Sequence, residues 1–560
     1  MLASSMYEPT VGLKSPRMQV TVAFNLMSTQ EFSTHCYCGN GMPMQEDQTK
    51  QILTTLQLVH GGKFDWSSSP PKFVFPITYH DQLYAILEER HNPWLTVEPL
   101  PVNILKVSRE KVAQESSASL IGNGQSQMKL DDIIPGHLLD QLAPFQKQGV
   151  EFILKNEGRA LLADDMGLGK TRTAIACAVA YSNEWPVLVV CPSSARHNWH
   201  SEIVSLLTPT IIKKADVLIV ESASNSLHPE TKNGRGRDYK FVIVSYNLIQ
   251  KMETRLRDMS FGMIICDECH YLKNGKANRT KVLTPMIKES KRAIMISGTP
   301  ALSRPMELFT QLNALNAKSW PDEKEFGRRY CRTEAVSTLS PNGVAQSEAS
   351  NSEFKGASNT QELHVLLTST LMIRRLKKDI LSSLPEKVRE VVKVDVKDDA
   401  KKAALRKQLD MFLLHEAGKA TGLNKKVRKT TSEDSLTTTG STPSETPEDR
   451  KAHMSLLLQL FTHSGEAKLP GVLEHVKIFL DNPRNGKLLI FAHHRVVMDS
   501  LAEYIVGRGV DMVRIDGQSS GRERHTNTTY FQATPTCRVA LLAITAAGKF
   551  RGVIEVITQY

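Results

Sequence analysis

The chain of 560 residues has no apolar run near the roughly 18 residues that a membrane-spanning helix needs. Its first residues, MLASSMYEPTVG, lack the basic-then-apolar layout of a secretory signal peptide. Only 8 cysteines are present, which argues against a disulfide framework and fits a reducing compartment. We therefore expect a soluble intracellular protein with no membrane partner.

Residues with metal-binding chemistry are also sparse. His35, Cys36 and Cys38 lie together, but no second ligand pair follows at the spacing of a zinc finger. A plain loop or strand is therefore favoured over a zinc site.

What is present supports ordinary packed domains. Hydrophobic residues make up 41% of the chain, and its length suits about three or four domains. The formal net charge of +11 favours a polyanionic partner, although solvated lysine-rich faces produce the same balance.

Short apolar strands alternate with amphipathic helices from about residue 130 to residue 332. That alternation is typical of a parallel sheet with helices on both faces. The predicted strands are Ala160–Ala163, Val187–Cys191, Val217–Glu221, Phe241–Val244, Met263–Cys266 and Ala293–Ile296. A second α/β unit begins later, with strands at Lys487–Ala492 and Val510–Ile515 around a helix at Val497–Val506.

The stretch Leu161–Thr171, LLADDMGLGKT, predicts a phosphate-binding loop. An apolar strand enters a glycine-rich turn, which ends in Gly-Lys-Thr and opens a helix. Backbone N–H groups of such a turn wrap phosphates while the lysine reaches the β and γ oxygens. The common pattern has glycine where this chain has Asp164, but Gly167 and Gly169 keep the tight part of the turn. The alternative is a glycine turn before a core helix.

About a hundred residues later, the sequence DECH (Asp267–His270) follows the apolar strand Met263–Cys266. Two adjacent carboxylates then stand at the carboxyl edge of the sheet, where Asp267 can hold Mg2+ and Glu268 can orient a water. Together the two motifs predict an NTP hydrolysis site.

Two further segments fall near the same sheet. Pro144-Phe145-Gln146 precedes the first strand and either meets an adenine or is an ordinary helix start. Ser297-Gly298-Thr299-Pro300 follows a strand, so its hydroxyls lie at the carboxyl edge.

The ordered set PFQKQG, DDMGLGKT, VVCPSS, DECHYLKN, SGTP and MIRRLKKDILSSLPEK resembles the Swi/Snf-like branch of helicase superfamily two, the double-stranded DNA translocases. The resemblance covers roughly residues 140–547. The SGTP motif and the segment from Arg374 to Asp379 argue against an RNA helicase.

Further stretches, VVCPSSARHNWHSEI, SGTPALSRPMELFTQLNAL, GRRYC and FAHHRVVMDSL, are similar to the HepA-related subgroup of annealing helicases, which rewind DNA and remodel stalled forks. Residues 64–107 are similar to the later half of the HARP domain that precedes the motor in that subgroup. An unrelated α+β module is the alternative.

The resemblance implies an α/β fold with tandem RecA-like parallel-sheet lobes behind a small α+β HARP-like domain. The expected organisation is a HARP-like domain (17–107), a linker (108–129), a first lobe (130–332), a helical insertion region (333–422), a disordered linker (423–450) and a partial second lobe (451–560).

Carried onto this sequence, the family's roles imply ATP and Mg2+ as cofactors. ATP binding falls on Gln146, Asp165, Met166, Gly167, Leu168, Gly169, Lys170 and Thr171. Metal binding falls on Thr171 and Asp267, and catalysis on Lys170, Asp267 and Glu268. Coupling of hydrolysis to movement falls on His270, Ser297, Gly298 and Thr299. The DNA-contacting candidates are Ser193, Ser194, Arg374, Arg375, His493 and Arg524.

The chain departs from the family near its end. A Gln/Arg-rich segment whose arginines complete the ATP site is expected beyond residue 547, yet only GKFRGVIEVITQY follows. No arginine finger can be assigned, which predicts an incomplete second lobe in a truncated or alternatively spliced product or a gene-model error. The basic helix that binds the single-strand-binding protein is not seen before residue 17, so the sequence does not support that partnership.

Two functions are carried forward. The first is an ATP-dependent annealing helicase or fork-remodelling translocase in DNA repair and replication stress. Its expected partners are forked or branched duplex DNA and single-strand/double-strand junctions, and its expected location is the nucleus. The second is a non-catalytic form that binds ATP and DNA. The basic run Lys425–Lys429 is read as a solvated run in preference to a nuclear signal.

Overall fold

The computed structural model describes residues 19–38, 44–59, 61–65, 72–89, 93–120, 129–227, 239–299, 304–331, 354, 356–380, 391–393, 396, 398–421, 447–483 and 485–544. These residues form two compact units, which divide near residues 381 and 382; residues 193–198 group with the second unit. Of the linker predicted at 423–450, residues 423–446 lie outside the described residues, as do the basic run Lys425–Lys429 and the residues beyond 544, whereas residues 447–450 begin a helix. No helix among the described residues is long and apolar enough to cross a membrane.

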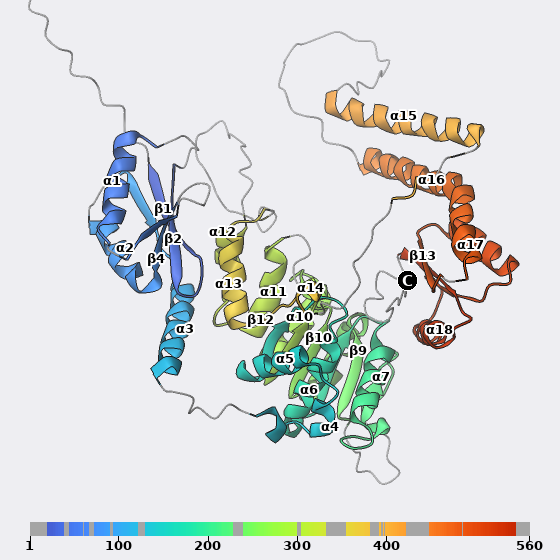
Figure 1. The fold of residues 1–560 in the computed structure, drawn as a ribbon, viewed down its shortest axis with the longest axis horizontal. Helices are drawn as coiled ribbons and strands as arrows, with labels where there is room; N and C mark the ends of the chain where they lie inside the picture. The colour runs from blue at the N-terminus through green and yellow to red at the C-terminus, as the bar shows by residue number, and fades with distance from the viewer. Residues whose placement is uncertain are drawn as a thin grey trace, which may run out of the picture. The chain divides into compact units, whose positions relative to one another are not determined.

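The first unit begins with a small α+β domain (Figure 1). Its strands lie in the order β3-β4-β2-β1-β5, with β5 parallel to β1 and the other pairs antiparallel. Its elements are β1 (Val20–Leu26), β2 (Glu31–Cys38), α1 (Glu46–Gln57), β3 (Lys63–Asp65), β4 (Lys72–Pro76), α2 (His80–Glu89), β5 (Leu95–Glu98) and α3 (Val102–Leu120).

Alternation of apolar residues explains this sheet. Val20, Val22 and Phe24 share one face of β1 because side chains alternate along a strand, and all three are fully buried. Phe24 packs on Phe32 of β2, with ring centroids 5.1 Å apart. His35, Cys36 and Cys38 lie in β2, and the described residues contain no group of three or more His, Cys, Asp or Glu side chains placed to hold a metal ion.

The next part of the chain forms a seven-stranded sheet in the order β12-β6-β11-β10-β7-β9-β8. All of its strand pairs are parallel. Its strands are β6 (Arg159–Leu162), β7 (Val187–Cys191), β8 (Val217–Ile219), β9 (Phe241–Ser245), β10 (Met263–Asp267), β11 (Arg292–Ile296) and β12 (Met372–Ile373). Every residue of β7 and β9 is buried, as in a parallel sheet with both faces covered. Six of the seven strands match predictions from the sequence to within two residues.

The helices of this first lobe are α4 (Gly136–Leu139), α5 (Pro144–Lys155), α6 (Lys170–Ala180), α7 (Arg196–Leu207), α8 (Tyr246–Ile249), α9 (Glu253–Asp258), α10 (Asn278–Glu289), α11 (Met306–Leu315), α12 (Glu323–Tyr330), α13 (Thr360–Thr370) and α14 (Lys377–Ile380). In helix α6 the residues from Thr173 to Val179 are buried, and all of them except Thr173 are apolar.

Two boundaries differ from the predicted organisation. The stretch 108–129 was expected to be a linker, but α3 continues to Leu120. Its Arg, Glu, Lys, Ala and Gln residues favour a helix more strongly than its serines favour a loop. The first lobe also extends beyond residue 332, because β12 adds to the edge of the sheet beside β6.

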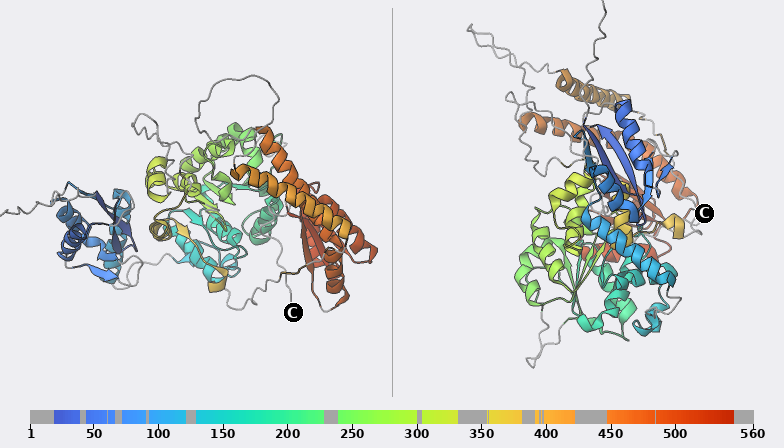
Figure 2. Two further views of the ribbon diagram at one scale, coloured as in Figure 1. Left: turned by 90° about the horizontal axis from the view of Figure 1, so that it is seen from above. Right: turned by 90° about the vertical axis from the view of Figure 1, so that its left-hand side faces the viewer.

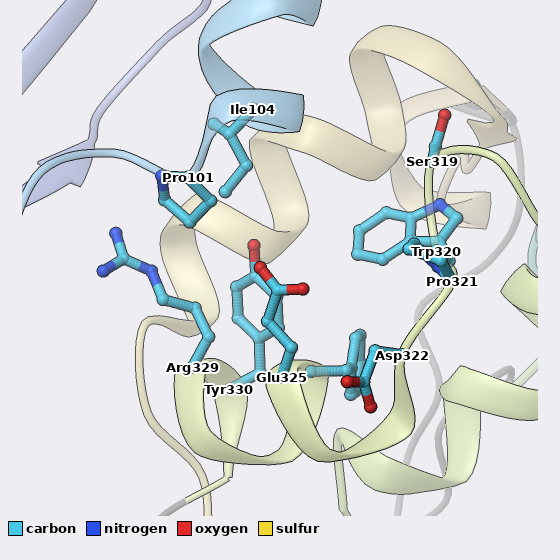
Figure 3. Close-up of a pocket in the computed structure, with 10 residues that line it drawn as sticks. Pro101, Ile104, Ser319, Trp320, Pro321, Asp322, Glu325, Arg329 and Tyr330 are labelled. Atoms are coloured by element: carbon cyan, nitrogen blue, oxygen red, sulfur yellow. The ribbon is translucent and has the colours of Figure 1, made fainter.

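A buried ion pair docks the small domain on the first lobe. Glu362 of α13, whose side chain is 1% exposed, accepts hydrogen bonds from Arg329 Nη2 at 2.7 Å and from the backbone N–H of Leu26 at 3.0 Å. Arg329 also donates to the carbonyl of Phe24 at 2.7 Å. Beside it, Ile104 of α3 and Trp320 line a cavity of about 30 Å³ (Figure 3).

The second unit holds a smaller parallel sheet in the order β13-β15-β14. Its elements are α15 (Asp399–Thr421), α16 (Pro447–Asp481), β13 (Leu488–Ala492), α17 (Arg495–Gly507), β14 (Met512–Ile515), α18 (Gly521–Ala533) and β15 (Val539–Ala543). Helices α15 and α16 run side by side (Figure 2). The predicted fold class is confirmed: two parallel-sheet α/β lobes are preceded in the chain by a small α+β domain.

Candidate nucleotide-binding site

The predicted phosphate loop joins β6 to α6. Gly167 and Gly169 adopt left-handed backbone conformations, with φ of 84° and 68°, which side chains strongly disfavour. Gly169 is the N-cap of α6, so the first backbone N–H groups of that helix have no partner within it. A Cβ at Gly167 would stand 2.7 Å from Lys377 Nζ. The loop is therefore shaped for glycine and leaves N–H donors at the end of a helix, where anions bind.

Lys170 is held inside this loop. Its Nζ donates to the carbonyl oxygens of Asp164 at 2.8 Å and Asp165 at 3.0 Å. Burial lowers the pKa of the Lys170 ammonium, while nearby carboxylates, Asp267 and Glu268 foremost, oppose that shift. A lysine with backbone acceptors can exchange them for phosphate oxygens.

The acidic pair stands at the same edge of the sheet. Asp267 ends β10, and its Oδ2 accepts a hydrogen bond from Trp199 Nε1 at 2.9 Å. Burial raises the pKa of Asp267 to about 6, and the adjacent Glu268 charge adds to that rise against the Trp199 hydrogen bond. Glu268 itself has a left-handed backbone, with φ of 50°, so a strained residue stands at the predicted catalytic position.

These residues fit a divalent cation. A hydroxyl on the first turn of α6, from Thr171, and the carboxylate of Asp267 are the oxygen ligands that Mg2+ prefers. Burial first, and then the adjacent Glu268 charge, raise the pKa of Asp267, and a bound cation would favour its ionised form.

A polar relay leads from the acidic pair to the next strand end. Glu268 Oε2 lies 3.1 Å from His270 Nδ1, which lies 3.4 Å from Ser297 Oγ. Ser297 is fully buried, and its Oγ accepts from the backbone N–H of Thr299 at 3.2 Å. The neighbouring Gly298 closes on the phosphate loop, because a Cβ there would stand 2.7 Å from Met166 Cγ. The structure thus brings together all four residues predicted to couple hydrolysis to movement.

Gln146 supports the loop from α5. Its Nε2 donates to the carbonyl of Leu168 at 3.1 Å, and its Oε1 accepts from the N–H of Ala143 at 2.9 Å. The side chain is 7% exposed. Contact with adenine stays a prediction, since both polar ends of this amide bind backbone groups here.

Two arginines predicted to contact DNA lie beside the phosphate loop. Arg374 Nη1 donates to the carbonyls of Ala163 at 3.0 Å and Gly298 at 3.3 Å. Arg375 binds the carboxylate of Asp164. A role of these arginines in DNA contact stays a prediction. Their bond to the loop was not predicted, although the charge match between residues 164–165 and the basic run 374–378 was a signal in the sequence.

Three of the other four predicted DNA contacts lie just after strands, and the fourth lies in a helix. Ser193 and Ser194 form the turn after β7, and His493 lies exposed in the turn after β13. Arg524 of α18 donates to the carbonyls of Ser519 at 2.8 Å and Asp516 at 2.7 Å.

Two residues of the site were missed in the sequence. Trp199 binds the Asp267 carboxylate, and the buried Tyr246 donates its hydroxyl to the Asp267 carbonyl at 2.8 Å. The only signal was chemical: buried Trp and Tyr need a hydrogen-bond partner for their polar ends.

A glycine-rich turn between a buried parallel strand and a helix, with two adjacent carboxylates at the same sheet edge, defines a phosphate-loop nucleotide-binding protein. The SNF2-related domain matches residues 145–445, more than half of the chain. The chain therefore belongs to the SNF2-related family, which confirms the family predicted from the motifs.

Named relatives agree with this membership. The chain is 35% identical over 466 residues to the Xenopus laevis "SWI/SNF-related matrix-associated actin-dependent regulator of chromatin subfamily A-like protein 1", covering 80% of this chain and 41% of that protein. It is 34% identical over 425 residues to the Bos taurus "DNA annealing helicase and endonuclease ZRANB3", covering 75% and 35%. The chain thus spans less than half the length of these two relatives.

Among solved structures, the "Sulfolobus solfataricus SWI2/SNF2 ATPase core in complex with dsDNA" is similar at a TM-score of 0.34 and 21% identity. That match covers 72% of this chain and 78% of the other.

Proposed function

We propose that the chain is a DNA-dependent ATPase that anneals DNA strands and remodels replication forks in DNA repair and replication stress. The observation that carries the proposal is the relay Glu268–His270–Ser297, which joins the acidic pair to the loop of Gly298 beside the phosphate loop. The printed names of the relatives, among them a DNA annealing helicase, support the choice of activity.

The residues divide the work of phosphoryl transfer. Thr171 and Asp267 would hold Mg2+, which would supply positive charge to offset that of the phosphates. Lys170 and the N–H groups of the glycine turn bind the same phosphates, and Glu268 orients the attacking water. His270 lies between Glu268 and Ser297, and its proposed role is to couple hydrolysis to the loop that follows Ser297.

The proposed partner is forked or branched DNA and its single-strand/double-strand junctions. The net charge of +11 suits a polyanion, and phosphate contacts of this kind weaken steeply with salt. The small domain of residues 19–120 is proposed as a HARP-like module for forks, and the protein is proposed to act in the nucleus. The candidate DNA contacts are Ser193, Ser194, Arg374, Arg375, His493 and Arg524.

The test is ATP hydrolysis by this 560-residue chain with forked DNA, plain duplex or single-stranded RNA, followed by rewinding of a partly unwound duplex. We expect forked DNA to stimulate hydrolysis most and rewinding to require ATP. Binding of ATP and forked DNA with no stimulated hydrolysis would establish the non-catalytic alternative. Stimulation by RNA alone would refute DNA as the substrate.

A further inference from the structure

Asp164 is a charged residue where phosphate loops commonly have glycine. Its side chain is 1% exposed, at the start of the loop that carries Lys170. A carboxylate buried this deeply costs free energy unless it is paired and hydrogen-bonded. Its partner therefore bears on the shape of the loop.

That partner is Arg375, 211 residues later in the chain. The Arg375 Nε donates to Asp164 Oδ1 at 3.0 Å, and Nη2 donates to Oδ2, which makes a bidentate pair. The backbone N–H of Arg375 adds a third bond to Oδ1 at 3.0 Å. The remaining terminal nitrogen, Nη1, donates to the carbonyl of Phe145, whose ring lies 5.5 Å from the guanidinium. One side chain thus ties the loop to α5.

The backbone on either side of Arg375 is hydrogen-bonded to the first residues of the phosphate loop. Ala163 N–H donates to the carbonyl of Ile373 at 2.8 Å, and Asp165 N–H donates to the carbonyl of Arg375 at 2.9 Å. The N–H of Lys377 donates to the carboxylate of Asp165 at 3.2 Å. The loop is therefore held from outside by the segment that follows β12.

The Asp164 carbonyl is also one of the two acceptors of Lys170 Nζ. Fixing the carboxylate of Asp164 consequently fixes the peptide group that holds the phosphate-binding lysine. We propose that Arg375 is a positioning residue for the phosphate loop: it locks Asp164, and thereby Lys170, in the nucleotide-binding shape. This inference rests on the proposed nucleotide site but needs neither DNA nor hydrolysis.

The physical consequence is a preorganised loop. A loop ordered before the nucleotide arrives costs nothing to order when it binds, whereas a loosened loop is competent only part of the time. Because Arg375 reaches the phosphates only through Asp164, its loss should weaken nucleotide binding more than it slows the bound complex.

The test compares the wild-type chain with Arg375→Lys. This variant keeps the positive charge but loses the guanidinium group that donates two hydrogen bonds to Asp164. We expect ADP affinity, measured by calorimetry without DNA, to fall by roughly 10- to 100-fold. The KM for ATP should rise by a similar factor while kcat at saturating ATP stays within about threefold. A merely structural role would instead lower the active fraction, and with it kcat, and leave KM and ADP affinity unchanged.

Arg292→Lys is the matched control. Arg292 makes an equally bidentate pair with Glu184, with both nitrogen–oxygen distances 3.0 Å, at the opposite edge of the same sheet. It should lower the melting temperature without changing ADP affinity. A double-mutant cycle of Asp164→Asn with Arg375→Gln adds a second measure: if the pair acts as a unit, the double variant should bind ADP no worse than the weaker single variant.

Unchanged ADP affinity in Arg375→Lys, or equal losses in Arg292→Lys, would overturn the proposal. A wild-type chain that binds ADP but shows no DNA-stimulated hydrolysis would refute the proposed function and leave the positioning role of Arg375 standing. A wild-type chain that binds no nucleotide would refute both.

Discussion

Buried charges are matched differently at the two ends of the strands in the seven-stranded sheet. At the edge where the strands begin, Arg159 donates four hydrogen bonds to carbonyls at the ends of α10 and α11. Nearby, Arg292 pairs with Glu184, and that hydrogen bond lowers the pKa of the glutamate. Both arginines have acceptors that match them, and Arg159 lies at helix carboxyl ends, where cations are favoured.

At the end of the sheet where the strands finish, Asp164 is matched by Arg375, but two further carboxylates share one ammonium. Asp267 and Glu268 face Lys170, and burial together with Glu268 raises the pKa of Asp267 to about 6. A balanced edge stabilises the fold, whereas an edge with excess buried negative charge is suited to a bound cation. The difference separates stabilising arginines from functional acids within a single sheet.

Glu268→Gln should produce the largest effect of the three substitutions. It should slow hydrolysis at the carboxyl end of the sheet and leave the stability of the fold unchanged. Loss of the group that orients water should reduce kcat by about 10²- to 10⁴-fold, while nucleotide affinity stays near that of the wild type. Single-turnover hydrolysis and nucleotide titration measure the two quantities. Normal hydrolysis by this variant would show that another residue activates the water.

Arg159→Ala should produce the converse result at the other edge. Four backbone carbonyls would lose their donor, which we expect to lower the free energy of unfolding by about 2–4 kcal/mol. Denaturant unfolding checks the loss, and ADP affinity of the folded variant should not change. A variant that loses ADP binding while keeping its stability would erase the distinction between the edges.

Ser297→Ala should have the smallest effect, because it removes one hydroxyl from the relay. The bonds to His270 and Thr299 are worth about 1 kcal/mol, so the ratio of hydrolysis with and without forked DNA should fall by about fivefold. Basal hydrolysis should change less than this ratio. Equal falls in both rates would place Ser297 in the hydrolysis step and not in coupling.

The sequence predicted most of the carboxyl edge because its residues occur in short, local motifs. A strand, a glycine turn and a helix are visible in LLADDMGLGKT, and the acidic pair follows its own strand. The link between Asp164 and Arg375 could not be read in this way, since 211 residues separate the two side chains. Strand β12, only two residues long, likewise has no periodic pattern of its own and exists because it pairs with β6.

The same limit explains α3 and Glu362. Helix α3 runs through a serine-rich stretch whose composition resembles a linker, and only propensity favours its helical form. Glu362 occupies an ordinary position on an amphipathic helix, and its buried pairing with Arg329 depends on the docked β1 backbone.

The most direct test is titration of the chain with Mg2+ and ATP, comparing the wild type with Lys170→Ala and with Arg159→Ala. The difference between the edges predicts that Lys170→Ala binds at least about tenfold more weakly, because it loses a charge-assisted contact to phosphate. Arg159→Ala should bind as the wild type does. Equal affinity of the wild type and Lys170→Ala would contradict the assignment of the nucleotide site to the carboxyl edge of this sheet.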